Sequence, residues 1–312
     1  MPRTFHLAAL AIPLVLLAAC VDHGPRNGQV VKRGTKALPA ADTSDEQIQR
    51  LNIRARKMPL LTAQAPMGGV TVRYLDDDRK PHKDNVDGRL WVQQHFDAHP
   101  PTADVVFYGR ISGQEILQAG KNDKTWWCIL HPNGNHAWTG DVKRLSADGA
   151  AQSTILRADR VLDVLAITLI EPDPSVKITL DCTPDRKANR LQFRRLTPSG
   201  GSQPPTPILE REILIDRASG QPTDVTLFQP DGQPLVHARL DTYRPVDFDN
   251  PGDAPPDGES PLMPHHVILD YPAAKSSIEM NFNDVSVPRK INPAVFETPD
   301  WDDLDIKPEI LQ

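Results

Sequence analysis

The chain has 312 residues, with 35 Lys and Arg against 41 Asp and Glu, and its formal net charge of −6 argues against a general nucleic-acid binder. Its 31 prolines are about twice the usual share, which disfavours helical bundles and coiled coils. Three cysteines are too few for a small disulfide scaffold or a four-thiolate zinc site, while 39% apolar residues suffice for a core.

The N-terminus predicts an export signal. Arg3 precedes an apolar run that ends at Ala19 and is too short for a good membrane span. Leu17-Ala18-Ala19-Cys20 resembles the lipobox of bacterial lipoproteins. The resemblance implies cleavage before Cys20, acylation of that residue, typically with palmitate, and attachment to a membrane, whereas the alternative is an ordinary cleaved signal. Val21 stands where an Asp signals retention in the inner membrane, which favours the outer membrane, facing the periplasm.

The rest of the chain divides into three predicted parts. Residues 20–43 are polar and rich in Gly and Pro, typical of a flexible tether. Residues 44–302 carry the strand patterns of one body, and residues 303–312 are expected to form a loose tail. The body starts with a helix, because Thr43 and Glu46 fit a capping box and an apolar stripe follows at helical spacing, made of Ile48, Leu51, Ala55 and Met58. Pro59 should end that helix at Met58.

Period-two patterns follow the helix and predict a meander of eleven or twelve strands. The predicted strands lie at or near 70–74, 90–92, 105–111, 115–119, 125–130, 176–182, 191–196, 211–215, 224–228, 235–243, 267–271 and 277–283. A helical interruption is expected over 153–167, and the Pro-rich stretches 197–207 and 246–264 are expected to be surface loops. The predicted fold class is mainly β, with a few helices.

The sequence lacks a recognisable catalytic or metal motif. It contains no Gly-x-Ser-x-Gly nucleophile elbow and no Gly-rich phosphate loop. His131 and His136 flank a tight turn without an evident third ligand, and the adjacent His265 and His266 should point to opposite faces of a strand. We therefore predict a non-enzymatic protein with no catalytic residue, no metal and no cofactor, and we retain an extracytoplasmic hydrolase as a less favoured reading.

Cys128 and Cys182 are the thiols that remain once Cys20 is acylated. In an oxidising compartment such a pair could form a disulfide, and the alternative is two buried, unreactive thiols. The neighbours Trp126 and Trp127 must face opposite sides of a strand, so Trp91, Phe107 and one of this pair could line one apolar surface or simply pack in the core.

Several strings, in order, resemble the LolA/LolB-like superfamily of lipoprotein carriers, receptors and related lipid-binding proteins. Gly88-Arg89-Leu90-Trp91-Val92 is similar to a Gly-x-Leu-Trp-Val strand of that family. The strings at 122–127 and 213–228 resemble two of its hairpins, and Ile291 to Pro299 resembles its closing motif. The soluble carrier of that family has an Arg that latches its lid, whereas the matching residues of this sequence, Gln93 to Asp97, include no permanent cation. A lipobox is found in the receptor branch of the family and not in the soluble carrier.

The resemblance implies a strongly curved antiparallel sheet, an open half-barrel of about eleven strands with an apolar concave face capped by helices. It implies a membrane-anchored lipoprotein that binds a lipid or an acylated lipoprotein, with a role in trafficking to the outer membrane. The residues expected to line the cavity and its lid are Trp91, Phe107, Trp126, Val161 and Leu165. The alternative is an envelope scaffold or stress sensor that uses the same fold to bind protein, through an exposed patch and with a narrow, filled concavity.

Overall fold

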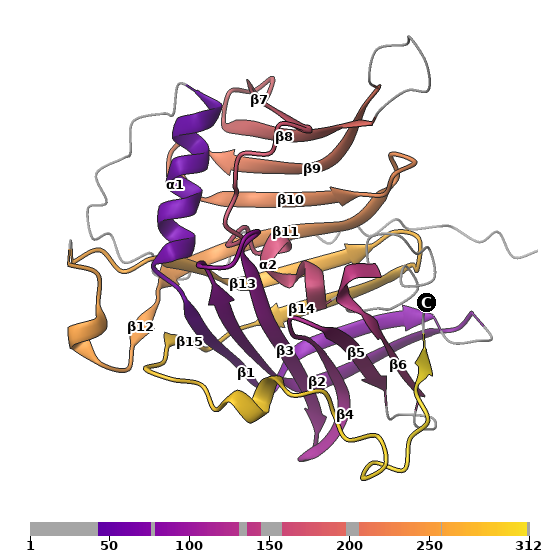
Figure 1. Ribbon diagram of the computed structural model, residues 1–312. Helices are drawn as coiled ribbons and strands as arrows, with labels where there is room; N and C mark the ends of the chain where they lie inside the picture. Colours follow the sequence, from indigo (N-terminus) through magenta and orange to yellow (C-terminus); the bar gives the residue numbers. More distant parts are fainter. Residues whose placement is uncertain are drawn as a thin grey trace, which may run out of the picture. The chain divides into compact units, whose positions relative to one another are not determined.

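The structure is a computed structural model that describes residues 43–75, 79–130, 136–144, 158–197, 206–256 and 258–310. Cys20, the predicted signal (1–19) and all but the last residue of the predicted tether (20–43) lie outside these residues. The described residues form a sixteen-stranded sheet that curves strongly (Figure 1). Its end strands, β7 and β16, are not paired with each other, so the predicted open, mainly β fold class is confirmed.

Two limbs of this sheet meet where β1 pairs with β14. The N-terminal limb contains β1 (Leu60–Leu75), β2 (Pro81–His95), β3 (Thr102–Ile111), β4 (Gln114–Lys121), β5 (Thr125–Leu130) and β6 (His136–Asp141). The C-terminal limb contains β7 (Val176–Cys182), β8 (Ala188–Thr197), β9 (Thr206–Asp216), β10 (Pro222–Phe228), β11 (Pro234–Pro245), β13 (Leu262–Tyr271) and β14 (Ser276–Asn281). Neighbouring strands within each limb are antiparallel, which suits the short turns of a meander.

Three further strands pair at the margins of the limbs. They are β12 (Asp247–Phe248), β15 (Asp284–Val287) and β16 (Glu309–Ile310). β15 pairs with the first half of β1, and β14 with the second half, on either side of a register break between Ala65 and Val70. All twelve predicted strands form. β6, β15 and the two-residue strands were not predicted: β12, β15 and β16 have too few residues to show a period, and β6 mixes Gly, Thr and charge.

Helix α1 (Ser44–Arg56) begins as its sequence predicts. The Thr43 side chain accepts a hydrogen bond from the Glu46 backbone N–H, and the Glu46 carboxylate accepts one from the Thr43 N–H. Leu51, Ala55 and Met58, three residues of the predicted apolar stripe, are buried, and Ile48 packs against the same core. The helix ends two residues before Met58, because Pro59 disfavours helical backbone just ahead of it.

A short segment at 158–170, which we call the plug, lies between the two limbs (Figure 1). It contains the 3-10 turn η3 (Ala158–Arg160) and the one-turn helix α2 (Val161–Val164). η3 contacts β3 and β4, and α2 contacts β10, although six strands separate β4 from β10 in the sheet. The sheet must therefore curve around the plug, and we call the face that the plug covers the inner face. Of the helix predicted over 153–167, the described residues form only the short elements η3 and α2.

The opposite, outer face is covered by residues 288–310, which we call the strap. The strap contains the 3-10 turn η5 (Pro293–Phe296) and β16, which pairs in parallel with β6. Ile291 and Phe296 pack with Val106 and Trp127, and Ile306 packs with Ile129. The prediction of a loose tail from residue 303 is wrong as far as residue 310, because Ile306 is buried against the sheet and the strand pairing follows it.

The remaining short elements connect strands. The 3-10 turns η1 (Val142–Arg144) and η4 (Pro251–Asp253) follow β6 and β12. β12 and η4 lie inside the stretch 246–264 that was expected to be loop, and β13 already begins at Leu262. None of the described helices is both long and apolar enough to span a membrane.

Candidate functional site

The inner face of the sheet is a continuous apolar surface. Buried side chains from both limbs join the plug in one hydrophobic cluster, including Leu90 and Phe107 from the N-terminal limb and Leu191 and Ile213 from the C-terminal limb. Gly88 makes part of this packing possible, because a Cβ there would lie 2.4 Å from the Val70 side chain. An apolar surface of this extent needs a cover, since exposed patches of such size promote association.

The plug is mainly apolar, which suits a segment buried between the two limbs. Among its buried residues are Val161, Leu162, Val164, Leu165 and Ile167. Val161, Leu162 and Val164 of the one-turn helix α2 are buried in the space between the limbs. Asp163 interrupts the apolar run and must find polar partners there.

Helix α1 holds the far end of the plug through Asn52. The Asn52 side-chain amide donates to the Ile170 carbonyl, and its oxygen accepts from the Ile170 N–H, both at 2.8 Å. This reciprocal pair satisfies both backbone groups of a residue that lies in neither a helix nor a strand.

Arg54, on the buried face of α1, holds the middle of the plug. Its guanidinium donates to the Leu165 carbonyl at 2.8 Å and the Ala166 carbonyl at 3.2 Å. The same group lies 5.7 Å from the ring centre of Tyr243 on β11. Arg54 therefore connects α1, the plug and the C-terminal limb. In this chain a cation on α1 thus contacts the covering segment.

A partly buried ion pair joins the plug to β9. Arg211 donates to the Asp163 carboxylate at 3.1 Å, and its guanidinium lies 4.0 Å from the Phe193 ring centre. Thr168 donates to the same carboxylate at 2.8 Å, and Arg160 lies 3.5 Å from its second oxygen. Burial lowers the pKa of Arg211, and the charge of Asp163 opposes that shift. Arg211 nevertheless stays cationic, as arginine does throughout the physiological range.

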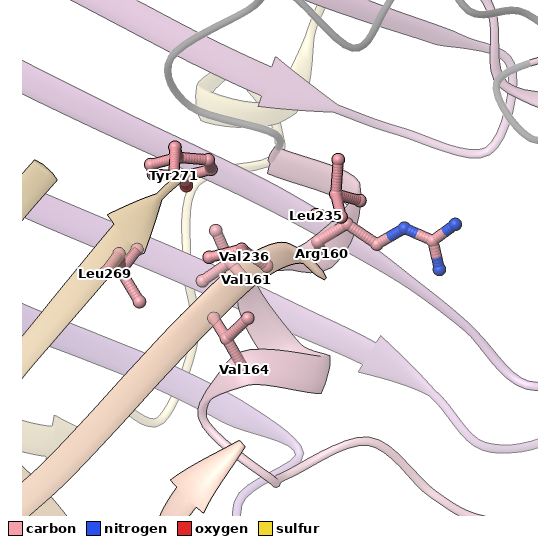
Figure 2. A pocket seen from close by; sticks show the side chains of 7 residues that line it. All are labelled: Arg160, Val161, Val164, Leu235, Val236, Leu269 and Tyr271. Carbon is pink, nitrogen blue, oxygen red and sulfur yellow. The ribbon is translucent and has the colours of Figure 1, made fainter. Parts of the chain in front are cut away.

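The space left between the plug and the C-terminal limb is small. A pocket of about 10 Å³, room for about one water molecule, opens beside α2 (Figure 2). Its lining residues are Arg160, Val161, Val164, Leu235, Val236, Leu269 and Tyr271. In Figure 2 the Arg160 guanidinium points away from the apolar side chains. Ligand pockets usually measure roughly 300–1,000 Å³, so this structure shows a covered inner face.

Four of the five residues expected to form the cavity and lid lie together on the inner face. Phe107 and Trp126 belong to the N-terminal limb, and Val161 and Leu165 belong to the plug. Trp91 lies on the outer face instead, with its ring edge-on to Tyr108 at 5.3 Å. The period of two explains the separation, because Leu90 and Val92 on either side of Trp91 are buried in the inner cluster.

The residues that hold the plug were not predicted as site residues. Arg54 is a cation within the apolar stripe of α1, and Asp163 is a charge within an apolar run, so each leaves a weak signal in the sequence. Asn52 and Arg211 leave none, because an ordinary polar residue on a helix or strand gives no sign of which distant segment it contacts.

The candidate disulfide between Cys128 and Cys182 is not formed. Both residues are free thiols, and β5 and β7 lie in different limbs of the sheet. Cys128 is buried on the inner face, and burial raises the pKa of its thiol to about 12. Cys182 is exposed, which corrects the alternative expectation that both thiols would be buried.

The histidines considered as metal ligands are dispersed among other partners. His265 is buried, while His266 faces outward between Asp241 at 2.8 Å and Glu279 at 3.3 Å, so the pair points to opposite faces as predicted. His136 stacks on Trp138, and His131 lies outside the described residues. Within the described ranges no group of three or more His, Cys, Asp or Glu side chains could hold a metal ion.

No family profile and no curated protein matches this chain. Among solved structures, it is similar to a domain proposed to belong to an outer membrane lipoprotein-sorting protein of Vibrio parahaemolyticus, with 8% identity, a TM-score of 0.43 and coverage of 81% of this chain and 97% of that one. It is also similar to a DUF1329 family protein of Desulfovibrio piger, with 8% identity, a TM-score of 0.43 and coverage of 82% and 98%. A third similar structure is a LolA superfamily protein of Nitrosomonas europaea, with 9% identity, a TM-score of 0.45 and coverage of 83% and 99%.

Proposed function

We propose that this protein is a non-enzymatic binder of a lipid or an acylated ligand, which it takes up on the inner face of its sheet when the plug moves aside. The observation that carries the proposal is an apolar face spanning both limbs under a separate short cover. Burial of each methylene of an acyl chain contributes about 0.8 kcal/mol, so a modest length of chain supplies the binding energy without any catalytic group.

The way in which the plug is held supports its movement. Asn52, Arg54 and Arg211 hold it through hydrogen bonds and one ion pair. Water can replace such contacts once they separate, and their net contribution is about 0.5–1.5 kcal/mol for each neutral hydrogen bond and about 1.5–3 kcal/mol for each bond of a charged group. A ligand that fills the same apolar volume can therefore compete with the plug at a moderate free-energy cost.

Brominated fatty acids test where the ligand binds, because bromine quenches tryptophan fluorescence on contact. Trp126 lies on the inner face and Trp91 on the outer face, so they form a matched pair. We expect brominated stearate to quench the wild-type protein, the quenched fraction to fall in Trp126→Phe, and no such fall in Trp91→Phe. Quenching that is unchanged in Trp126→Phe, or its absence from the wild-type protein, would contradict the proposal.

We also propose that the protein is anchored through acylated Cys20, at the outer membrane and facing the periplasm. The support is the lipobox Leu17 to Cys20 and Val21 after it. Such an anchor would place the binding domain next to a bilayer, where lipids and acylated proteins are transferred. A Cys20→Ala protein should move from the membrane fraction to the soluble fraction, and an unchanged distribution between detergent and water would refute the anchor.

The second candidate function is an envelope scaffold or sensor that uses the same fold to bind protein. One observation favours it, namely that side chains of the plug and both limbs pack in one cluster and that the pocket beside α2 measures only about 10 Å³. Under this reading the plug is a permanent part of the core. The quenching experiment separates the two functions, because a permanent plug excludes the brominated probe from Trp126.

A further inference from the structure

One cation on the inner face stands out from its surroundings. Along β9, Arg211 alternates with Ile213 and Ile215, which are buried in the apolar cluster. The Arg211 side chain is 16% exposed and its guanidinium lies against the Phe193 ring. A permanent charge in such a row needs a counterion, since an unpaired charge is strongly disfavoured in an apolar environment.

In the described part of the chain, the counterion of Arg211 is supplied by the plug. Asp163 is its ion-pair partner at 3.1 Å, and this carboxylate also accepts from Thr168 within the same segment. Movement of the plug therefore removes the counterion while Arg211 stays on the sheet with the apolar residues. An incoming ligand without negative charge would leave Arg211 unpaired.

We propose that the ligand is an anionic amphiphile whose carboxylate or phosphate pairs with Arg211 while its acyl chain covers the inner face. The inference rests on the proposed function and adds the chemistry of the head group. Asp163 then acts in the covered state as an internal substitute for the anion of the ligand. The planar fork of Arg211 suits this role, since guanidinium groups bind carboxylates and phosphates through paired hydrogen bonds.

The location of the ion pair fits this arrangement. Arg160, which contacts the same Asp163, also lines the apolar pocket beside α2 (Figure 2). The apolar surface and the charged group are therefore adjacent, as an amphiphile with one charged end requires.

The test compares probes that share one acyl chain and differ in the head group. A fatty acid carries a carboxylate, the matching lysophosphatidic acid carries a phosphate, and the matching monoacylglycerol is neutral. We expect the wild-type protein to bind the two anionic probes about tenfold to a hundredfold more tightly than the neutral one, as a charged hydrogen bond would provide. Inorganic phosphate is titrated separately, to distinguish an amphiphile from a free anion.

Two variants assign the preference to the ion pair. Arg211→Gln should abolish the preference for the anionic probes over monoacylglycerol, and because it also removes one contact that holds the plug, the neutral affinity should not fall. Asp163→Asn removes the internal competitor and should favour the anionic probes over the neutral one even more. Arg239→Gln, which changes an exposed arginine paired with Asp270, is the matched control and should keep the wild-type preference.

The outcomes separate this inference from the function on which it rests. If the wild-type protein binds all three probes equally, or Arg211→Gln changes the affinities for all three by the same factor, Arg211 only fastens the plug and the inference is overturned. Saturable binding of inorganic phosphate alone would overturn it in favour of a soluble anion. Binding of none of the acylated probes overturns the proposed function itself. If Arg211→Gln does not fold, the inference is tested by the probe series with the other two proteins. The wild-type protein should prefer the anionic probes, and Asp163→Asn should increase that preference.

Discussion

The two faces of the sheet are covered by different kinds of contact. On the outer face, the strap buries Ile291, Phe296 and Ile306 against the sheet. On the inner face, the plug is also apolar, but side chains of α1 and β9 hold it through hydrogen bonds and an ion pair.

This difference indicates which cover can move. The strap continues directly from β15 and ends by pairing with β6, so both of its ends are tied to the sheet. At its middle, Asn122 on the β4–β5 turn donates to the Phe296 carbonyl. The plug makes no strand pairing among the described residues, and its polar contacts can be exchanged for water. We infer that the outer cover is part of the stable fold and that the inner cover opens.

The largest expected effect comes from breaking the outer cover. Phe296→Ala removes a buried ring and should lower the free energy of unfolding by about 3–5 kcal/mol, measured by urea denaturation. The exposed neighbour variant Glu297→Ala should stay within about 0.5 kcal/mol of wild type. Probe binding by folded Phe296→Ala should be unchanged, and a gain in probe binding would show that the strap also controls the inner face.

Breaking the inner cover should cost less stability and change access more. Asn52→Ala leaves both backbone groups of Ile170 without their partner, at a cost of about 1–3 kcal/mol. The variant should expose Cys128 on the inner face, so alkylation of this thiol should be faster than in wild type while the exposed Cys182 reacts at the same rate. The exposed α1 variant Gln49→Ala is the control, and equal Cys128 rates in all three proteins would argue against an opening plug.

Acid should destabilise the protein through His265. Its Nδ1 lies 2.7 Å from the Phe282 carbonyl and therefore donates, while its buried Nε2 has no hydrogen-bond partner among the described residues. Burial lowers the pKa of this imidazole from its ordinary 6.5, so the folded protein keeps it neutral while the unfolded chain takes up a proton. The neutral imidazole of His265 is therefore tolerated at no cost above the pKa that it has in the unfolded chain. The folded protein loses stability as the pH falls below about 6.5, because only the unfolded chain then gains the proton.

His265→Asn checks this sign. The asparagine amide can still donate to Phe282 but does not titrate, so the variant should no longer show the acid-dependent loss in the free energy of unfolding. That loss amounts to up to about 1.4 kcal/mol for each unit of pKa shift and is measured by urea denaturation between about pH 7.5 and 5.5. His266→Asn on the outer face should retain it. An unchanged pH dependence in His265→Asn would assign acid sensitivity to other groups.

The smallest effect is expected at Cys182. Since this thiol is free and exposed on an end strand, Cys182→Ser should change the free energy of unfolding by less than about 0.5 kcal/mol, even under oxidising conditions. A disulfide with Cys128 would instead make the loss about 2–4 kcal/mol. The comparison of reduced and oxidised wild-type protein provides the same information without a substitution.

Much of the fold could be predicted because its signals are local. The capping box at Thr43 and Glu46, the apolar stripe of α1 and the period-two strands each depend on residues close together in the chain. The same periodicity placed Trp126 and Trp127 on opposite faces. Strand β6 was missed because its residues His136 to Asp141 mix Gly, Thr and charge and acquire their place only through pairing with β5.

The sequence by itself determined the class of the fold, the position of α1, most strands and the candidate anchor at Cys20. Only the tertiary structure decided that Trp91 faces away from Phe107 and that the two candidate cysteines lie in different limbs. It also brought Asn52, Arg54 and Arg211 to a plug more than forty residues away in the chain. The physical reason is that period and capping act over one or two turns, whereas curvature and burial depend on contacts between segments distant in sequence.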